Sequence, residues 1–505
     1  MAKQKSRKRR SQAVQRSDKA PKLPQSSAVQ TSADFADRVM CQRLHQIEHI
    51  GANAYLLALA AWQRGLKVTF HYTFTHSERF AHLPLTGYRG EFLTISDGRK
   101  THDFYRVMGD LTTRRASALA ESKPHTKAVL AKADIDVAEG VVVEPGQQQL
   151  VERFLAEREG RRFLMKPVNG TLGRGVLRNL TAKTVLDQLA SFQQPMLLEE
   201  FVVGTEYRVY VTDDRVISAM IRRPACVQGD GQHSVEQLVE SKAAARRAHP
   251  VYRDDPIVLD GEALAFLAVH GHTPDEVPAA GTRVYLSDVP SQHAGGDMVD
   301  ASDYLPEAVR DIAVRAARAL GLPHAGLDLI VTSPPDDEGA ARDGDGQDGG
   351  MKGSTSIRTV VLEANQNPYI RLSSIPMPGV FENASNRITE SIIDHYFPRS
   401  VHWPRLVRAS FDFPAICQML QSGVVGEVSL PVLGRDWVHE RFTLPATQVD
   451  QGLVDRIHQA RLRYGVHAQL LRSETGDVTV DAVAPKAQWE AMRQALASVL
   501  APLLR

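Results

Sequence analysis

Residues 197–223 read LLEEFVVGTEYRVYVTDDRVISAMIRR, and the alternation of apolar and polar residues predicts β-strands. Glu199 and Glu200 end the first apolar run, and Glu206 follows after a glycine turn. Acids at a strand exit can accept hydrogen bonds from an adenine amino group or ribose hydroxyls, although a solvated strand end shows the same pattern. Arg222 and Arg223 close the last strand, where arginine suits bidentate contact with phosphate or carboxylate, or a surface ion pair.

A glycine-rich loop lies upstream of this stretch. Lys166 ends a predicted strand and is followed by PVNGTLGRGV, residues 167–176. Glycines allow backbone N–H groups to approach phosphate oxygens, and Lys166 and Arg174 add positive charge. The loop glycines are Gly170, Gly173 and Gly175. The spacing is neither that of a Walker A loop nor that of a dinucleotide-binding fingerprint, so phosphate binding and a structural turn both remain open.

Two further strand-like runs carry acids. Asp328 lies within GLDLIV, and Glu363 and Asn365 lie within VVLEANQNP. Buried carboxylates are unfavourable unless they are paired or bind a metal. Hard oxygen ligands on neighbouring strands suit Mg²⁺ when phosphate completes the coordination shell. A magnesium site and a pair of structural acids are the two interpretations of this pattern.

In this order the motifs resemble the ATP-grasp superfamily, particularly the branch of cyanophycin synthetase and the bifunctional glutamate–cysteine ligase/glutathione synthetase. The resemblance covers roughly half the chain, from Lys123 to Arg371. Further segments that carry it are 122–140 (SKPHTKAVLAKADIDVAEG), 199–240, 249–260 (HPVYRDDPIVLD), 277–303 (VPAAGTRVYLSDVPSQHAGGDMVDASD) and 363–371 (EANQNPYIR).

The resemblance implies a role for each matched residue. Contacts with the nucleotide are implied for Lys127, Lys166, Gly170, Gly173, Arg174, Gly175, Glu199, Glu200 and Glu206. Arg223, with Arg222 beside it, would stabilise the transferred phosphoryl group, and Arg371 would contact the substrate carboxylate. Two Mg²⁺ ions, with Mn²⁺ as an alternative, would be held by Asp328, Glu363 and Asn365.

The implied activity is that of an ADP-forming carboxylate–amine ligase. ATP would phosphorylate a substrate carboxylate, and an amine would attack the resulting acyl phosphate to give an amide or peptide bond. Amino-acid-like or peptide-like small molecules are the expected substrates, and the expected assembly is a homodimer or homotetramer. Two alternatives are a nucleotide-sensing or nucleic-acid-associated protein that binds ATP without ligation, and a ligase that adds amino acids to a protein tail.

Two departures from the family pattern leave the substrate open. Residues 291–296 read SQHAGG where the related stretch commonly reads S/T-T-G-G after an asparagine. The segment 363–371 lacks the glycine often found after the proline. Both positions lie where the family binds its acceptor or acyl substrate. The Mur-ligase-like and large glutamate–cysteine ligase modules of the relatives have no counterpart in this chain.

The organisation expected along the chain combines α/β and α+β units around an ATP-grasp fold. Residues 1–33 form a disordered basic tail, 34–122 an N-terminal α/β domain, 123–398 the ATP-grasp domain and 399–505 a small α+β appendage. The Gly/Asp/Ser-rich stretch 333–356 is expected to be a flexible loop between two hairpin strands, as a substrate lid or a tolerated surface insertion.

Composition is consistent with a globular chain. Of 505 residues, 43% are apolar and 24% charged, which excludes fibrous and wholly disordered classes. The longest apolar run, 54–62, is far shorter than the about 20 residues of a membrane span, and no secretory signal is recognised. Three scattered cysteines predict a reducing, cytoplasmic setting. Residues 1–22 hold nine basic residues and one acid without an aromatic side chain, so nucleic-acid binding is not expected.

Overall fold

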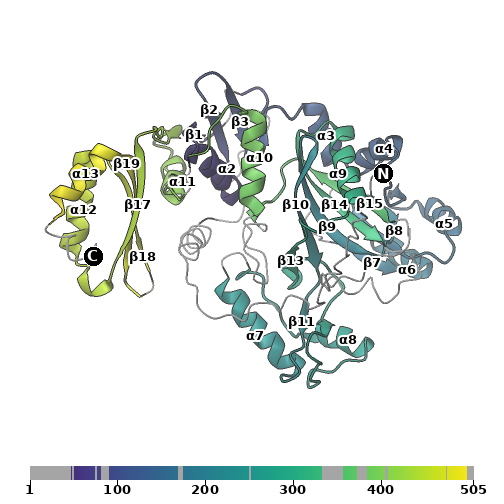
Figure 1. The fold of residues 1–505 in the computed structure, drawn as a ribbon. Helices are drawn as coiled ribbons and strands as arrows, with labels where there is room; N and C mark the ends of the chain where they lie inside the picture. The colour runs from purple at the N-terminus through teal and green to yellow at the C-terminus, as the bar shows by residue number, and fades with distance from the viewer. Residues whose placement is uncertain are drawn as a thin grey trace, which may run out of the picture. The chain divides into compact units, whose positions relative to one another are not determined.

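A computed structural model describes residue 47 and residues 51–73, 77–80, 90–168, 175–249, 252–332, 357–371, 384–403, 406, 408–473 and 475–497 (Figure 1). It is a mixed α/β protein with several antiparallel sheets, as the sequence predicts. Within these residues, no helix combines the length and the apolar character needed to cross a membrane.

The first sheet is five-stranded, in the order β16-β1-β2-β3-β4. Helix α2 packs on it, because the helix is apolar on almost every side and buried over nearly its whole length. The bounds are α2 Gly51–Gln63, β1 Lys67–His71, β2 Phe92–Ser96, β3 Thr101–Tyr105, β4 Met108–Gly109 and β16 Glu427–Ser429.

Strand β16 corrects one expectation. The expected C-terminal appendage, residues 399–505, includes this strand, whereas β16 pairs antiparallel with β1 of the first sheet. The preceding segment packs beside the same sheet. Phe411 lies 5.2 Å from Tyr55 and Phe413 lies 5.4 Å from Phe70, between ring centroids. Aromatic burial against a distant part of the chain, which no local pattern reports, draws this segment into the first sheet.

The second sheet is four-stranded, in the order β5-β8-β6-β7. Helices α5 and α6 cover it through an apolar cluster that includes Val151, Phe154, Val185 and Leu198. The two strands predicted before the glycine loop and at Glu199 and Glu200 are confirmed. The bounds are β5 Gly140–Val143, α5 Gln148–Ala156, β6 Phe163–Pro167, β7 Leu177–Leu180, α6 Ala182–Gln188 and β8 Met196–Glu200.

The third sheet is five-stranded, in the order β13-β10-β9-β14-β15. Helices α3, α4 and α9 contribute to the apolar cluster on one of its faces (Figure 1). Strands β14 and β15 pair as the predicted hairpin, while the intervening 333–356 segment lies outside the described residues. The bounds are α3 Arg114–Glu121, α4 Lys123–Lys132, β9 Thr205–Thr212, β10 Arg215–Arg223, β13 Asp297–Asp300, α9 Glu307–Leu320, β14 His324–Thr332 and β15 Arg358–Asn365.

Two smaller units complete the described chain. The two-stranded sheet β11-β12 shares a core with α7 and α8, and the sheet β17-β19-β18 shares one with α12 and α13. Sequence reasoning missed β17, in which charged and aromatic residues interrupt the alternation. The remaining bounds are β11 Cys226–Gln228, α7 Val235–Ala248, α8 Gly261–Val269, β12 Arg283–Tyr285, α10 Ala384–Tyr396, α11 Phe413–Gln421, β17 Trp437–Leu444, α12 Gln451–Tyr464, β18 His467–Arg472, β19 Val478–Pro485 and α13 Lys486–Ala495.

Candidate active site

The third sheet has one apolar face and one face rich in charge. Successive side chains of a strand point to opposite faces. Val209 and Val211 of β9 therefore join the cluster beneath the helices, while Glu206, Arg208 and Tyr210 share the opposite face. Register places Asp328 of β14 beside Arg208 on that second face. The strand pattern thus collects acids and arginines on one surface.

Asp328 and Arg208 form a two-point ion pair at the centre of this face. Arg208 Nη2 donates to Asp328 Oδ2 at 2.8 Å, and Arg208 Nε donates to Oδ1. The Asp328 side chain is only 5% exposed. Burial raises the pKa of Asp328, but Arg208 and Arg222 outweigh that effect and the net pKa lies below the ordinary value. Asp328 is therefore held as a carboxylate.

Arg222 links Asp328 to Glu206. Its Nη1 donates to Glu206 Oε1 at 2.8 Å and lies 3.5 Å from Asp328 Oδ2. Burial raises the pKa of Glu206, and this effect exceeds the opposing influence of Arg222. The carboxylates of Glu206 and Asp328 and the guanidiniums of Arg208 and Arg222 together have no net charge. A bound anion or cation would therefore alter these ion pairs.

The acids expected to bind magnesium lie together at β14 and β15. Asp328 and Glu363 are direct partners in the antiparallel register. Such partners have Cβ atoms about 5 Å apart, and like charges at that spacing repel. Asn365 Nδ2 donates to Glu363 Oε1 at 3.1 Å. Two carboxylates and an amide fit Mg²⁺, which takes few protein ligands and completes its shell with water and phosphate.

The same part of the structure does not form a self-sufficient metal centre. Among the residues whose placement is described, no group of three or more His, Cys, Asp or Glu side chains is arranged to hold an ion. A site of two carboxylates therefore depends on oxygen ligands from elsewhere, as expected where phosphate is bound at the same time.

Two lysines meet at Glu199 on the second sheet. Lys166 Nζ lies 2.7 Å from Glu199 Oε2, and Lys127 Nζ is paired with Oε1. Lys127 also donates to the carbonyl oxygen of Ala138 at 2.7 Å. Burial lowers the pKa of Lys127; Glu199 opposes this effect and Lys166 reinforces it. The cluster has one positive charge in excess, which favours an anionic ligand.

Other predicted nucleotide contacts lie nearby or beyond the described residues. Glu200 follows Glu199 at the end of β8 and lies 3.8 Å from Arg161 Nε. Gly175 has a φ of +70°, which favours glycine. Three loop residues lie outside the described residues, and the structure tests nothing about them: Gly170, Gly173 and Arg174.

The two adjacent arginines of β10 differ in their surroundings. Arg222 contacts the carboxylates, whereas Arg223 follows it in the strand and therefore points to the other face. Arg223 pairs in register with Asp297 of β13. The structure accordingly brings Arg222, the residue that the sequence analysis placed second, to the central cluster.

Arg371 is buried at the end of the segment after β15. It is 3% exposed, and its Nη1 donates to the Tyr369 hydroxyl at 3.4 Å. The Tyr210 hydroxyl donates to the carbonyl oxygen of Tyr369 at 3.0 Å, so this segment passes over the charged face of the sheet. Asn53 of α2 holds the same segment, donating to the carbonyl oxygen of Pro368 at 3.0 Å.

Arg208 belongs to this charged cluster, and sequence reasoning missed it. The signal was present: in EYRVYV, Arg208 stands two residues from Glu206 and two from Tyr210, on the face opposite the valines. Its pairing with Asp328 comes from the register of strands 120 positions apart, which no local pattern indicates.

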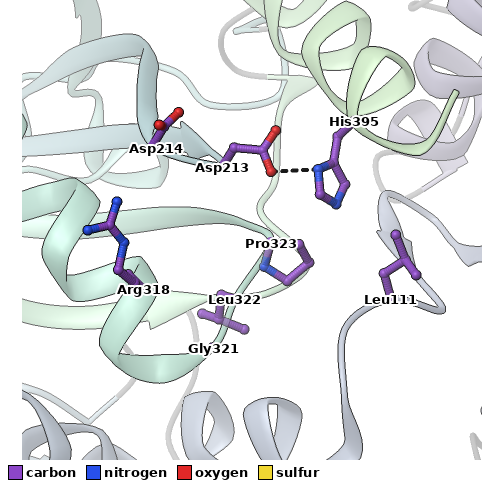
Figure 2. A pocket seen from close by; sticks show the side chains of 8 residues that line it. All are labelled: Leu111, Asp213, Asp214, Arg318, Gly321, Leu322, Pro323 and His395. Carbon is purple, nitrogen blue, oxygen red and sulfur yellow. Dashed lines mark ion pairs between the residues drawn. The ribbon is translucent and has the colours of Figure 1, made fainter. Parts of the chain in front are cut away.

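A separate cavity of about 710 Å³ lies at the other end of the β9–β10 hairpin (Figure 2). Asp213 follows β9, roughly 20 Å along the strand from Glu206 at 3.3 Å per residue. Figure 2 shows the Asp213–His395 ion pair at its wall, 2.6 Å from Oδ1 to Nδ1. The lining residues are Leu111, Asp213, Asp214, Arg318, Gly321, Leu322, Pro323 and His395, and none belongs to the predicted site.

Comparisons with known proteins agree with the motifs. No protein-family model matches the chain. A glutathione biosynthesis bifunctional protein from Desulfotalea psychrophila is 30% identical over 280 residues, which cover 54% of this chain and 34% of that protein. A cyanophycin synthetase from Nostoc sp. is 28% identical over 309 residues, 58% of this chain and 31% of that protein.

Among solved structures, a bifunctional glutathione synthetase from Pasteurella multocida shares 27% identity. The match covers 61% of this chain and 40% of that one, with a TM-score of 0.44. The chain spans about a third of the length of the two relatives named first. Their sequence similarity confirms the resemblance to ATP-grasp ligases that the motifs predict.

Proposed function

We propose that this chain is an ATP-dependent carboxylate–amine ligase that forms an amide or peptide bond through an acyl phosphate and releases ADP. The observation that supports the proposal most strongly is the charged face of the third sheet. There Asp328 and Glu363 stand opposite each other in register, and Arg208 and Arg222 lie beside Asp328.

The nucleotide would lie between this face and the lysine pair of the second sheet. Lys127 and Lys166 would exchange part of their contact with Glu199 for phosphate oxygens. Glu206 would accept from ribose hydroxyls, and Glu199 and Glu200 would lie at the adenine end. The glycine loop at 170–175 would exclude water, which would otherwise hydrolyse an acyl phosphate.

Asp328, Glu363 and Asn365 would hold two Mg²⁺ ions, with Mn²⁺ as a substitute. Bound to the phosphates, these ions would neutralise charge that develops in phosphoryl transfer. Arg222 and its neighbour Arg223 would stabilise the transferred group, and the contacts of Arg222 with Glu206 and Asp328 support this role for Arg222. Arg371 would position the substrate carboxylate. Its Nη1 donates to the Tyr369 hydroxyl, and Asn53 holds the segment that carries Arg371.

Amino-acid-like or peptide-like molecules are the proposed substrates, because a carboxylate donor and an amine acceptor are what this chemistry joins. The proposal extends to a homo-oligomeric enzyme with an N-terminal layer at 34–122, a nucleotide-binding domain at 123–398 and a smaller C-terminal unit.

The test is ADP release from Mg-ATP in the presence of pooled amino acids and dipeptides, with mass spectrometry of the products. Glu363→Gln should lower turnover at least about a hundredfold, because an amide would hold Mg²⁺ more weakly and the ion would neutralise the charge that develops on phosphate. Glu440→Gln, on the partly exposed face of β17, is the matched control and should retain activity. Equal turnover by wild type and Glu363→Gln would contradict the proposed role of Glu363.

A further inference from the structure

We propose that His293, oriented by the buried carboxylate of Asp255, is the base that takes a proton from the acceptor amine. The inference rests on the proposed ligase function and deepens it, since it assigns a residue to the second half of the reaction. An amine is protonated near neutral pH and carries no lone pair until one proton is removed. A ligase acting on amino-acid acceptors therefore gains from a base at the acceptor position.

The geometry of the pair defines which nitrogen can act. His293 Nδ1 lies 2.5 Å from Asp255 Oδ1, and Gln292 Nε2 donates to the other oxygen at 2.5 Å. An ionised carboxylate is an acceptor only, so it fixes the proton on Nδ1. That tautomer leaves the lone pair on Nε2. The Asp255 side chain is 6% exposed and the His293 side chain 59%, so a buried acid presents an accessible ring.

A fully buried arginine fixes the two loops that carry this pair. Arg246 is 0% exposed and donates from both Nε and Nη2 to the carbonyl oxygen of Asp255, at 2.9 and 2.7 Å. Its Nη2 also donates to the carbonyl oxygen of Gln292 at 3.3 Å, and its Nη1 to Asp297 Oδ1 at 2.7 Å. Because one rigid guanidinium bonds both segments, the separation of Asp255 and His293 is set by the fold.

The loop that carries His293 runs beside the end of β10. The 3-10 turn that contains His293 leads into β13, where Asp297 is the register partner of Arg223. A Cβ added at Gly296 would lie 2.6 Å from the carbonyl oxygen of Arg223, so the chain after His293 runs against the end of β10. Arg222, which contacts Asp328, is the preceding residue of that strand.

The charge of Asp255 also acts on the phenol of Tyr369. Burial raises the pKa of that phenol, Arg371 lowers it and Asp255 raises it. Tyr369 in turn accepts from Arg371, the residue proposed for the substrate carboxylate. The chain around His293 thus reaches the end of β10, the strand that carries Arg222.

A second histidine–carboxylate pair, His233 with Asp230, differs from the His293–Asp255 pair in the burial of its carboxylate and in its sequence separation. His233 Nδ1 lies 2.6 Å from Asp230 Oδ2, nearly the separation found for His293. Its side chain is 56% exposed, but Asp230 is 41% exposed as well, and the two residues are three apart at a helix start. That pair is a local surface contact, whereas Asp255 and His293 are brought together across 38 positions and share a buried clamp. His233 is therefore a matched control.

The proposed step balances as follows. The acceptor ammonium gives one proton to His293 Nε2, and the nitrogen lone pair attacks the carbonyl carbon of the acyl phosphate. The new C–N bond forms, the C–O bond to phosphate breaks, and phosphate leaves with the bond electrons. The second proton of the nitrogen leaves with the phosphate as HPO₄²⁻, and the imidazolium returns its proton to water.

Hydroxylamine separates this step from the rest of the reaction, because it is largely unprotonated at neutral pH and needs no base to attack an acyl phosphate. Full-length wild type, His293→Gln and His233→Gln would be assayed with Mg-ATP and the amino-acid and dipeptide pool, with and without hydroxylamine. Amide product should fall about a hundredfold or more in His293→Gln, within the range of general base catalysis. Hydroxamate formation should stay near wild type, and His233→Gln should match wild type for both products.

Two additional variants distinguish a catalytic role of His293 from a structural one. His293→Ala should regain amide formation when imidazole is added, which a merely structural role would not produce. Asp255→Asn should lower the ratio of amide to hydroxamate, because an amide no longer accepts from both His293 and Gln292. Equal loss of amide and hydroxamate in His293→Gln, or an unchanged ratio in every variant, would overturn the inference. If wild type forms neither product, the proposed ligase function itself fails, and the inference with it.

Discussion

At the scale of single residues, Asp328 lies at the centre of the charged sheet face. It accepts from Arg208, lies beside Arg222 and stands opposite Glu363 in register. Loss of one partner from a buried ion pair leaves the other charge uncompensated, and the cost is about 3–5 kcal/mol. The same carboxylate is proposed as a magnesium ligand, so its removal should affect both folding and turnover.

Asp328→Asn should lower the free energy of unfolding by about that amount and abolish ADP formation. Asp481 provides a matched control. It is buried in the C-terminal sheet, where it is paired with Arg441 at 3.1 Å and with His439. Asp481→Asn should lose comparable stability yet retain ADP formation. Chemical denaturation and an ADP assay on both variants measure the two effects, and full activity in Asp328→Asn would contradict the assignment.

At the scale of elements, the segment 368–371 packs closely on the third sheet and positions Arg371, the residue proposed to contact the substrate carboxylate. A Cβ at Gly326 of β14 would lie 2.7 Å from the Cβ of Pro368, so the segment 368–371 packs directly on the strand. Asn53 of α2 holds the segment from the other side, since its Oδ1 accepts from the backbone N–H of Ile370 at 3.2 Å. Arg371 therefore depends on two elements far from it in sequence.

Gly326→Ala should displace this segment and raise the KM for the carboxylate substrate several-fold, while the KM for ATP changes less. A contact of 2.7 Å between carbon atoms is inside van der Waals separation, so one partner must move. Gly261→Ala is the control, because an added Cβ at that position meets nothing within 4 Å. Steady-state kinetics in both substrates check the prediction, and an unchanged carboxylate KM would count against it.

Most elements could be predicted from the sequence, whereas several tertiary pairings could not. Helix α9 and the β9–β10 hairpin follow from local periodicity and end signals, including Gly321 with a φ of +69°. The partner of Arg208, the addition of β16 to the first sheet and the two-loop clamp at Arg246 arise from contacts between remote segments. Local patterns identify what a side chain can do, and register decides which side chains meet.

At the scale of the whole molecule, one buried histidine makes stability depend on pH. His324 is 2% exposed at the start of β14. Burial, reinforced by the nearby His395, lowers the pKa of His324 to about 4 from 6.5. The unfolded chain binds this proton first as pH falls. The contribution of neutral His324 to the free energy of unfolding is therefore complete above pH 6.5 and declines as pH falls toward 4.

This histidine should contribute a loss of about 2 kcal/mol between pH 6.5 and pH 5, at about 1.4 kcal/mol per pH unit. Urea unfolding of wild type and His324→Phe at the two pH values measures the contribution. The variant should show a smaller difference between the two curves. Identical pH dependence in both proteins would show that His324 does not titrate in this range.

The basic tail should not be required for ligation. Residues 1–22 carry nine basic residues, while the proposed active-site residues all lie from Lys127 onward. Deletion of residues 1–30 should leave ADP formation near wild type. A nucleic-acid-associated function would instead predict loss of nucleic-acid binding on deletion, which a salt-dependent binding assay would detect.

The most direct test of the ligase proposal is ADP and phosphate release from Mg-ATP against pooled amino acids and dipeptides, with mass spectrometry of the same reactions. The account predicts substrate-dependent ADP release, a product at the summed masses of two substrates minus water, and loss of both in Glu363→Gln. ATP binding without turnover or condensation product in any pool would contradict it and favour a protein that binds the nucleotide without ligation.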